Sequence, residues 1–268
     1  MSNRLEGKVA LVTACTRGIG RAIADLFVDE GAKVYYACRN METGKAAVEA
    51  ARARGGQAEL VYFEAHDPAT HRSMIDECIA KEGRLDVLVN NFGESNPRKD
   101  LDITKCTYKE FEKTVCVDLS TVFNACQEAL NKAMLKQHSG SIINIGSVGG
   151  LYPDLSRTAY GVSKAAIHFL TKDIAVQYAR QGVRCNAVLP GFTATDAALN
   201  NMSQAFLDLF LKNVPLNRPG RPEDIADAVA FLASDRAAFI TGEILPVAGG
   251  FGLPTPLYGS YMSAGAKG

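Results

Sequence analysis

Short apolar segments that are rich in β-branched residues alternate with helical segments along almost the whole chain. Buried strands are predicted at residues 9–13, 33–38, 58–63, 85–90, 141–145, 183–189 and 243–247. Helical periodicity is found at residues 19–30, 43–54, 70–81, 108–135, in the segment containing Tyr160 and at 223–233. Strands that alternate with helices predict a parallel sheet with helices on both faces. Since no linker or shift in composition divides the chain, we expect one α/β domain over residues 1–268.

The turn after the first predicted strand has the glycine spacing of a dinucleotide-binding loop. Glycines between a strand and a helix let the backbone approach a pyrophosphate at the positive end of the helix. The residues expected to line this phosphate site are Thr13, Thr16, Arg17, Gly18, Ile19 and Gly20. Ala14 stands where such turns usually have their leading glycine. Because the turn lies in the first strand–helix unit, it favours a Rossmann-type doubly wound sheet.

The end of the second predicted strand indicates which dinucleotide binds. In NAD-binding proteins, a carboxylate about 20 residues past the glycines holds the ribose hydroxyls. Counting from Gly18 leads to Cys38 and then Arg39, so no carboxylate stands there. Arg17 and Arg39 would instead flank a 2′-phosphate, which the planar guanidinium group suits. We therefore predict NADP(H) as the cofactor, and the alternative is that Arg39 is only a solvated surface charge.

Three polar side chains near the fifth predicted strand suit the chemistry of alcohol oxidation. Ser147 follows the strand at 141–145, at the edge where open α/β sheets bind ligands. Tyr160 and Lys164 are four residues apart, so a helix presents them on one face. An ammonium beside a phenol favours the phenolate, and making a phenol useful near neutral pH takes roughly 3–4 kcal/mol of such stabilisation. The same spacing occurs by chance on ordinary helices, so the pair gains meaning only together with the cofactor motif.

Composition excludes several other classes of protein. The 29 basic and 29 acidic residues cancel, so neither a nucleic acid nor an anionic membrane is expected as a partner. The apolar runs are too short to span a membrane, and the start of the chain lacks the apolar core of a secretory signal. Seven dispersed cysteines without a Cys-x-x-Cys pair indicate reduced thiols and a cytoplasmic protein. Four isolated histidines show no metal-ligand spacing, so no metal is expected.

Taken in order, these motifs resemble those of the short-chain dehydrogenase/reductase family along nearly the whole chain. The resemblance is carried by the glycine turn at 13–20, Asp67, Asn90-Asn91-Phe92-Gly93, Ser147, Tyr160, Lys164, Pro190-Gly191, Thr195, Arg218, the segment 222–226, Thr241-Gly242 and Gly249-Gly250. No single piece is specific to the family, but the order and spacing of the whole set are.

This resemblance implies a nicotinamide-dependent oxidoreductase whose strands follow the order 3-2-1-4-5-6-7. It implies that Tyr160 is the catalytic acid/base, that Lys164 assists it and holds the nicotinamide ribose, and that Ser147 orients the substrate oxygen. Asp67 would bind the adenine. The other implied cofactor-binding positions are Asn91 and Gly93 on the adenosine side and Pro190, Gly191, Thr193 and Thr195 at the nicotinamide end. Family members are often homotetramers, so a homo-oligomer is expected.

The chain also departs from the family pattern at several positions. Asp118 stands where the family has a fourth-helix Asn that belongs to a proton relay to the lysine, and we keep Asp118 among the catalytic candidates. A carboxylate there keeps the shape of Asn but adds a negative charge that opposes a phenolate. The relay is then either altered or carried by the backbone carbonyl alone. Phe92 and Ala248 also replace the usual residues of their motifs, and none of these changes removes the Ser147, Tyr160 and Lys164 set.

A narrower resemblance is to the 7α-hydroxysteroid dehydrogenases of gut bacteria. It is carried by the segments 5–10, 90–93, 153–157, 184–191, 214–218, 247–251 and 255–258. These enzymes oxidise a ring hydroxyl of a bile acid with NADP⁺, so the resemblance implies an apolar steroid alcohol or ketone as substrate. The alternatives are another regiospecificity such as 12α, a 3-oxoacyl thioester reductase, or a non-enzymatic dinucleotide sensor on the same fold.

Two segments near the end of the chain are candidates for covering the substrate. Residues 193–214 interrupt the alternation after the sixth predicted strand, and we expect them to form an apolar lid. Its apolar side chains are those of Leu199, Met202, Phe206, Leu209, Phe210 and Val214. The tail at 251–268 begins with an apolar, proline-containing stretch that would close the same pocket or that of a neighbouring subunit. The alternative for the lid is that it simply packs on the domain or on another subunit.

Overall fold

A seven-stranded parallel sheet lies at the centre of the computed structural model, which describes residues 3–199 and 203–265. The strands are β1 (Val9–Thr13), β2 (Lys33–Cys38), β3 (Gln57–Tyr62), β4 (Val87–Asn90), β5 (Gly140–Ile145), β6 (Val183–Pro190) and β7 (Ile244–Val247). Their order across the sheet is β3-β2-β1-β4-β5-β6-β7, and every neighbouring pair is parallel. The predicted doubly wound α/β sheet is therefore confirmed, strand order included.

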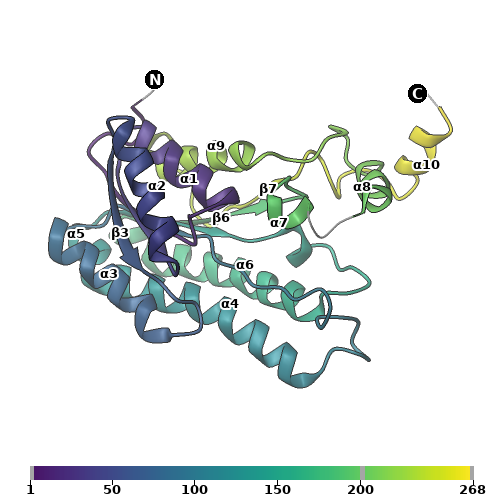
Figure 1. The fold of residues 1–268 in the computed structure, drawn as a ribbon, viewed down its shortest axis with the longest axis horizontal. Helices are drawn as coiled ribbons and strands as arrows, with labels where there is room; N and C mark the ends of the chain where they lie inside the picture. Colours follow the sequence, from purple (N-terminus) through teal and green to yellow (C-terminus); the bar gives the residue numbers. More distant parts are fainter. Residues whose placement is uncertain (1–2, 200–202, 266–268) are drawn as a thin grey trace.

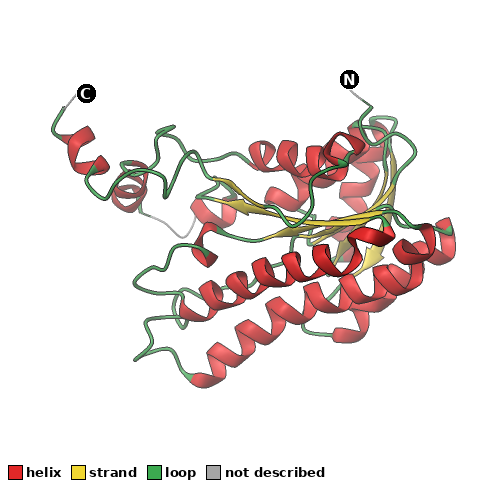
Figure 2. Cartoon of the chain, turned by 180° about the vertical axis from the view of Figure 1, so that it is seen from behind, coloured by secondary structure: helices red, strands yellow, loops and turns green. Residues whose placement is uncertain are grey.

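Helices cover both faces of this sheet (Figure 1). One layer consists of α1 (Gly18–Asp29), α2 (Met41–Ala53) and α9 (Pro222–Ala233), and the other of α3 (Pro68–Glu82), α4 (Tyr108–Ala129) and α6 (Thr158–Tyr178). Figure 2 shows the sheet edge-on between the two layers. Strand side chains alternate between two buried clusters, so Val12 packs under the first layer whereas Leu11 packs under the second. This double burial explains why the strands are almost continuously apolar.

Some element bounds differ from the sequence-based prediction. The helix expected over 108–135 is α4 followed by a π-helical turn, η1 (Leu130–Met134), and a final turn, α5 (Leu135–Gln137). Several short helical segments lie in the connections between the main strands and helices or after the last strand: η2 (Val148–Gly150), η3 (Ala179–Gln181), α7 (Asp196–Leu199), α8 (Gln204–Leu211), η4 (Asp235–Ala237) and α10 (Tyr258–Ser263). Within the described residues, no helix combines the length and the apolar character that a membrane crossing requires.

The strand pairing brings distant parts of the sequence to one edge of the sheet. Val12 of β1 pairs with Val89 of β4, and Val89 in turn pairs with Ile143 of β5. β6 continues this alignment because Ile143 pairs with Asn186. Since all strands are parallel, the loops that follow β1, β4, β5 and β6 emerge side by side. In Figure 1, α7, α8 and α10 lie beyond the end of the sheet.

Candidate active site

The residues that the sequence singles out for chemistry gather at the carboxyl edge of the sheet. Thr13 ends β1, Asn91 follows β4, Ser147 follows β5 and Pro190 ends β6. Open α/β sheets bind ligands at this edge, where the connections leave in opposite directions. The order β1-β4-β5-β6 therefore places the expected phosphate site and the expected catalytic side chains along one continuous edge.

The turn after β1 forms a cradle that only small residues can line. Ala14 adopts the left-handed backbone region with φ of 53°, which explains why this position usually carries glycine, and Gly18 does the same with φ of 56°. A Cβ at Gly20 would collide with the side-chain nitrogen of Asn91 and lie 2.6 Å from the Ala14 carbonyl oxygen. α1 begins at Gly18 with no side-chain cap from Arg17. Its first N–H groups thus suit the phosphates of a dinucleotide.

Thr13 and Asn91 tie this turn to the loop after β4. The Thr13 hydroxyl accepts a hydrogen bond from Asn91 N at 2.9 Å and lies 3.3 Å from Phe92 N. In return, the Asn91 amide nitrogen donates to the carbonyl oxygens of Thr13 and Ala14, both at 3.1 Å. These bonds fix the left-handed Ala14, so both predicted residues shape the cradle through contacts within the protein.

The expected 2′-phosphate position at the end of β2 is lined by exposed cations. Arg17 and Arg39 are both exposed. The Arg39 side chain is 73% accessible, and its Nε lies 3.6 Å from a carboxylate oxygen of Glu64. Cys38 is buried, its thiol donates to Asn40 O at 3.4 Å, and burial raises the pKa of that thiol. Arg39 is thus held by one long ion pair that a phosphate group can replace.

The residues expected on the adenosine side lie in the loops that follow β3 and β4. Asp67 caps α3, because its carboxylate accepts a hydrogen bond from Ala69 N at 3.1 Å. Gly93 lies against Lys164, and a Cβ at this glycine would come within 2.7 Å of the Lys164 ammonium. Gly93 is therefore the position that lets the lysine pass beneath this loop.

Ser147, Tyr160 and Lys164 come together beside η2. Ser147 precedes η2, and its Oγ accepts a hydrogen bond from Gly149 N at 3.1 Å. A Cβ at Gly149 would lie 3.4 Å from Ser147 Oγ and 3.9 Å from the Tyr160 ring, so the Ser147 and Tyr160 side chains lie close to each other beside this glycine. The Lys164 ammonium lies 5.5 Å from the centroid of that ring. The hydroxyl, phenol and ammonium thus form one group, as the sequence predicts.

Lys164 is almost completely buried, with 2% of its surface accessible. Its ammonium donates to the Ile145 carbonyl oxygen at 3.1 Å. A buried ammonium is stable only with such partners, and the carbonyl at the end of β5 supplies one. α6 thus holds a charge directly beneath the candidate acid/base.

Asp118 is fully buried on α4, and its carboxylate is held by two donors. Oδ2 accepts from the Ser163 hydroxyl at 2.7 Å and Oδ1 accepts from Glu94 N at 2.8 Å. Burial raises the pKa of the Asp118 carboxyl, against the opposing effects of the Lys164 charge and the two hydrogen bonds. The side chain therefore joins α4 to α6 and to the loop after β4.

Two further residues shape the site, although neither was predicted from the sequence. Asp100 is fully buried, and its two oxygens accept from Ala159 N at 2.8 Å and from Tyr160 N at 2.9 Å. His168 lies beneath the Ser147 loop, where Ser147 N faces its Nε2 at 3.5 Å. Burial and the nearby lysine charges lower the pKa of His168 to about 4, so its imidazole is neutral and can accept this bond. Asp100 carries no sequence signal because it lies 60 residues before Tyr160.

The end of β6 completes the edge on the expected nicotinamide side. Gly191 packs against Ala248, and a Cβ at Gly191 would lie 2.8 Å from the Ala248 side chain. The buried Thr193 hydroxyl donates to Gly191 O at 3.2 Å. A Cβ at Gly18 would come within 3.2 Å of the Thr195 methyl group, so Thr195 lies next to the glycine turn. The predicted nicotinamide-side and phosphate-side residues are thus adjacent.

The segments expected to form the lid and the tail contact one another through a run of aromatic rings. The Phe210 ring stacks on Phe251 at 5.0 Å between centroids, with an interplanar angle of 11°. Phe192 lies 5.8 Å from Phe210, and Tyr152 lies 5.8 Å from Phe251. These four rings join the loop after β5, the loop after β6, the lid and the tail of one chain. Met202 and residues 266–268 lie outside the described residues.

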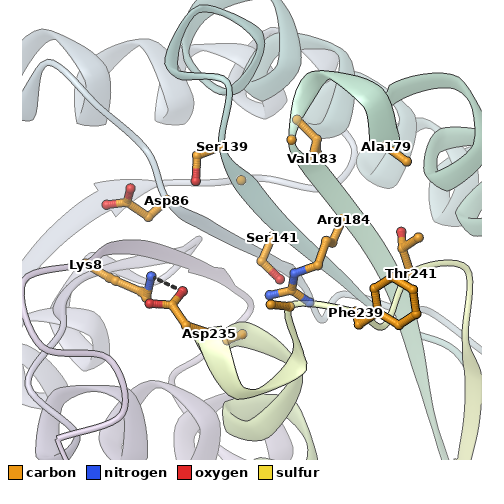
Figure 3. A pocket seen from close by; sticks show the side chains of 14 residues that line it. Lys8, Asp86, Ser139, Ser141, Ala179, Val183, Arg184, Asp235, Phe239 and Thr241 are labelled. Atoms are coloured by element: carbon orange, nitrogen blue, oxygen red, sulfur yellow. Dashed lines mark hydrogen bonds and ion pairs between the residues drawn. The ribbon is translucent and has the colours of Figure 1, made fainter.

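A separate hollow of about 530 Å³ lies at the opposite edge of the sheet (Figure 3). Lys8 and Asp235 form an ion pair at 2.8 Å at its wall. The Arg184 guanidinium donates to the carbonyl oxygens of Leu232 at 2.8 Å and Ser234 at 3.2 Å. Because these charges already have partners within the protein, this hollow does not compete with the carboxyl edge as the candidate active site.

Comparisons with known proteins agree with this geometry. A family model described as enoyl-(acyl carrier protein) reductase matches residues 13–252. The chain is 49% identical to the 7α-hydroxysteroid dehydrogenase of Clostridium sardiniense, over 96% of this chain and 98% of that protein. It is 44% identical to the 7α-hydroxysteroid dehydrogenase of Paraclostridium sordellii, over 98% of each.

More distant relatives carry a different activity in their names. The chain is 34% identical to the 3-oxoacyl-[acyl-carrier-protein] reductase FabG of Thermotoga maritima, over 92% of this chain and 98% of that protein. The solved crystal structure of gox2181 superposes with a TM-score of 0.88 at 31% identity, over 93% of this chain and 97% of that chain.

Proposed function

The chain belongs to the short-chain dehydrogenase/reductase family of nicotinamide-dependent oxidoreductases, and from this premise we propose that it is an NADP(H)-dependent hydroxysteroid dehydrogenase. The proposed reaction interconverts a ring hydroxyl and a ketone of a bile acid, with the 7α-hydroxyl as the preferred position. The observation that carries this proposal is the grouping of a hydroxyl, a phenol and a buried ammonium beside η2. The names of relatives at 49% and 44% identity support the steroid class.

In the proposed mechanism, Tyr160 exchanges a proton with the substrate oxygen. During oxidation its phenolate takes the hydroxyl proton of the alcohol, and during reduction the phenol returns a proton to the carbonyl oxygen. Ser147 Oγ already accepts from Gly149 N, so its own hydrogen serves as a donor to the substrate oxygen. The Lys164 ammonium favours the phenolate. The dinucleotide, when bound, supplies the hydride acceptor or donor.

The cofactor preference that we propose rests on the charges at the end of β2. The cradle formed by Gly18 and Gly20 fits a pyrophosphate, and the exposed Arg17 and Arg39 fit the added charge of a 2′-phosphate. Arg39→Asp should weaken NADPH binding far more than NADH binding in a fluorescence titration. Arg236→Asp is the matched control, because it makes the same charge change at an exposed position on η4. Equal losses for both cofactors would overturn the NADP(H) preference.

The aromatic run suits a rigid, largely apolar substrate. Phe192, Phe210, Phe251 and Tyr152 connect the lid and the tail above the carboxyl edge. Aromatic side chains offer large apolar surfaces with few conformational choices, and apolar pockets with a few polar groups are typical of small-molecule sites. We therefore propose that the lid and tail of the same chain cover the steroid.

A set of bile acids tests the proposed reaction directly. The protein is incubated with NADP⁺ and bile acids that carry a 7α-hydroxyl, only a 12α-hydroxyl, or only a 3α-hydroxyl, while the absorbance of reduced cofactor is followed. Turnover of the 7α-hydroxylated compounds alone is expected. Tyr160→Phe should abolish turnover and still bind NADPH. Turnover of the 12α compound alone would replace the proposed regiospecificity, and undiminished turnover by Tyr160→Phe would overturn the mechanism.

The second candidate function is reduction of a 3-oxoacyl thioester. It is favoured by relatives named FabG, including that of Thermotoga maritima at 34% identity. Acetoacetyl thioester and NADPH therefore form a second arm of the same assay. Reduction of the thioester without turnover of any bile acid would replace the steroid proposal. A protein that binds NADPH and turns over neither compound would instead favour a non-enzymatic dinucleotide sensor.

We also infer that the protein is a homo-oligomer in the cytoplasm. Apolar side chains lie exposed on the outer faces of α4 and α6, namely Phe123, Phe169 and Val176, with accessible fractions of 49%, 68% and 83%. Light scattering after size-exclusion chromatography should give a multiple of 28.7 kDa, and Phe169→Glu should lower it. A monomer at all concentrations would overturn this inference. The seven free cysteines fit a reducing compartment, which cell fractionation tests.

A further inference from the structure

The residue that precedes α6 has an unusual backbone conformation. Arg157 adopts the left-handed region, with φ of 67° and ψ of 41°. Glycine or asparagine is favoured in this region, and a long side chain there is uncommon. Such outliers persist where the surrounding structure holds them, and they occur preferentially at functional sites. Arg157 precedes Tyr160, the proposed acid/base, by three residues.

A loop from a distant part of the chain holds Arg157 in this conformation. Arg157 N donates to Asp100 O at 2.9 Å. The Thr158 hydroxyl donates to Leu101 O at 2.9 Å. The buried Asp100 carboxylate takes the next two N–H groups, those of Ala159 and Tyr160. The start of α6 is therefore fixed at four successive residues, and the direction of the Arg157 side chain is fixed with it.

The result is that a guanidinium lies over the ring of Tyr160. The Arg157 Cζ atom is 4.3 Å from the ring centroid, closer than the Lys164 ammonium at 5.5 Å. A cation within about 6 Å of an aromatic face is attracted by the ring. The attraction increases when the ring carries negative charge, because a direct Coulomb term is then added. The phenolate form of Tyr160 thus gains more from Arg157 than the phenol form does.

We propose that Arg157 is a positioning residue for the reaction, whose guanidinium holds the Tyr160 ring and favours its phenolate. This inference rests on the proposed role of Tyr160 as the acid/base. Lys164 acts in the same direction from the second turn of α6. Other titratable groups lie on the elements around Tyr160: Asp100 accepts from the backbone N–H of Tyr160, Asp118 on α4 accepts from Ser163 Oγ and from Glu94 N in the loop after β4, and His168 lies further along α6.

Two substitutions separate the charge of Arg157 from its bulk. Arg157→Met keeps an unbranched apolar chain over the ring and removes the charge, whereas Arg157→Lys keeps the charge with a different head group. Both retain a side chain in the left-handed backbone region, so backbone strain is similar in the two variants. Arg180→Met is the matched control, because it removes an exposed guanidinium from η3 after the far end of α6.

The first measurement is the pH dependence of kcat for alcohol oxidation. In Arg157→Met the midpoint of the rise in kcat should move up by about half a pH unit, because the Coulomb attraction between the solvent-exposed guanidinium and the phenolate is lost. Arg157→Lys should move it less, and Arg180→Met should leave it unchanged. If Arg157 were only part of the fold, Arg157→Met would lower kcat or thermal stability without moving the midpoint, and that result would overturn the inference.

The second measurement needs no substrate. The tyrosinate absorbance is titrated for the wild type and Tyr160→Phe, and the difference between the two curves belongs to Tyr160. The same subtraction is made in the Arg157→Met background, where the difference curve should lie at higher pH. A shifted curve in a protein that oxidises no steroid would keep the inference and reject the proposed substrate. An unshifted curve would reject the inference whatever the substrate is.

Discussion

Replacing Asp118 tests how a buried carboxylate is accommodated where the family has an asparagine. The Asp118 side chain is fully buried and accepts two hydrogen bonds, from Ser163 Oγ at 2.7 Å and from Glu94 N at 2.8 Å. Asp118→Asn has the same shape and keeps an acceptor for Glu94 N. Its NH₂ group faces Ser163 Oγ, which can accept because the serine hydrogen can turn to Tyr160 O at 2.9 Å.

The two substitutions should therefore differ in their cost to stability. Asp118→Ala leaves Glu94 N without its acceptor, and an unpaired buried donor costs about 1–3 kcal/mol of unfolding free energy, to which a small cavity adds. Asp118→Asn keeps both contacts and removes a buried charge, so the unfolding free energy should change by less than about 1 kcal/mol at acid pH and rise at neutral pH.

The way in which the stability difference between the wild type and Asp118→Asn changes with pH tests whether the buried carboxyl is responsible for it. Burial raises the pKa of the Asp118 carboxyl, so the folded protein binds this proton more tightly than the unfolded chain does. The stabilising contribution of such a group is complete below the unfolded value near 3.9 and is lost as pH rises through the folded value. The wild type should therefore lose stability relative to Asp118→Asn as pH rises from about 4 towards neutrality.

Urea unfolding of the wild type and both variants at a series of pH values measures these differences. The unfolding free energy of Asp118→Asn should exceed that of the wild type by an amount that grows with pH. The unfolding free energy of Asp118→Ala should stay below that of Asp118→Asn at every pH. An advantage that is independent of pH, or an asparagine variant as unstable as the alanine variant, would refute the reasoning about the buried charge.

Three further predictions concern other contacts of the site. Asp100→Ala removes the acceptor of two N–H groups of α6, so it should lower the unfolding free energy in urea by about 2–4 kcal/mol and also reduce kcat. Unchanged stability would show that Asp100 does not hold the start of α6. Burial lowers the pKa of His168 to about 4, so the unfolded chain binds this proton more readily than the folded protein does. The unfolding free energy of the wild type should therefore fall by up to about 3 kcal/mol as pH falls from about 6.5 to 4, and His168→Gln should not show this fall in acid titrations of stability. Phe251→Ala removes the ring that stacks on Phe210, so it should raise KM for the steroid several-fold and leave KM for NADPH almost unchanged. An equal rise in both KM values would argue against the proposal that these rings cover the steroid.

Much of the fold could be predicted because its signals lie within short stretches of sequence. The apolar strand at residues 141–145 and the turn at 13–20 are recognisable from residue type and spacing alone. The prediction of one continuous helix over 108–135 was less accurate near its C-terminal end, where a π-helical turn at Leu130–Met134 interrupts the α-helix. Such a turn depends on packing around it, which periodicity in the sequence does not report.

The sequence by itself determined the parallel sheet, the glycine cradle and the placing of Tyr160 and Lys164 on one helical face, because each depends on backbone geometry repeated between near neighbours. Only the tertiary structure decided that Asp100 clamps α6 and that Arg157 lies over the Tyr160 ring. Asp100 reaches Tyr160 across 60 residues of chain. Contacts of this kind exist only once the helix layers have packed on the sheet, and no local pattern of residues encodes them.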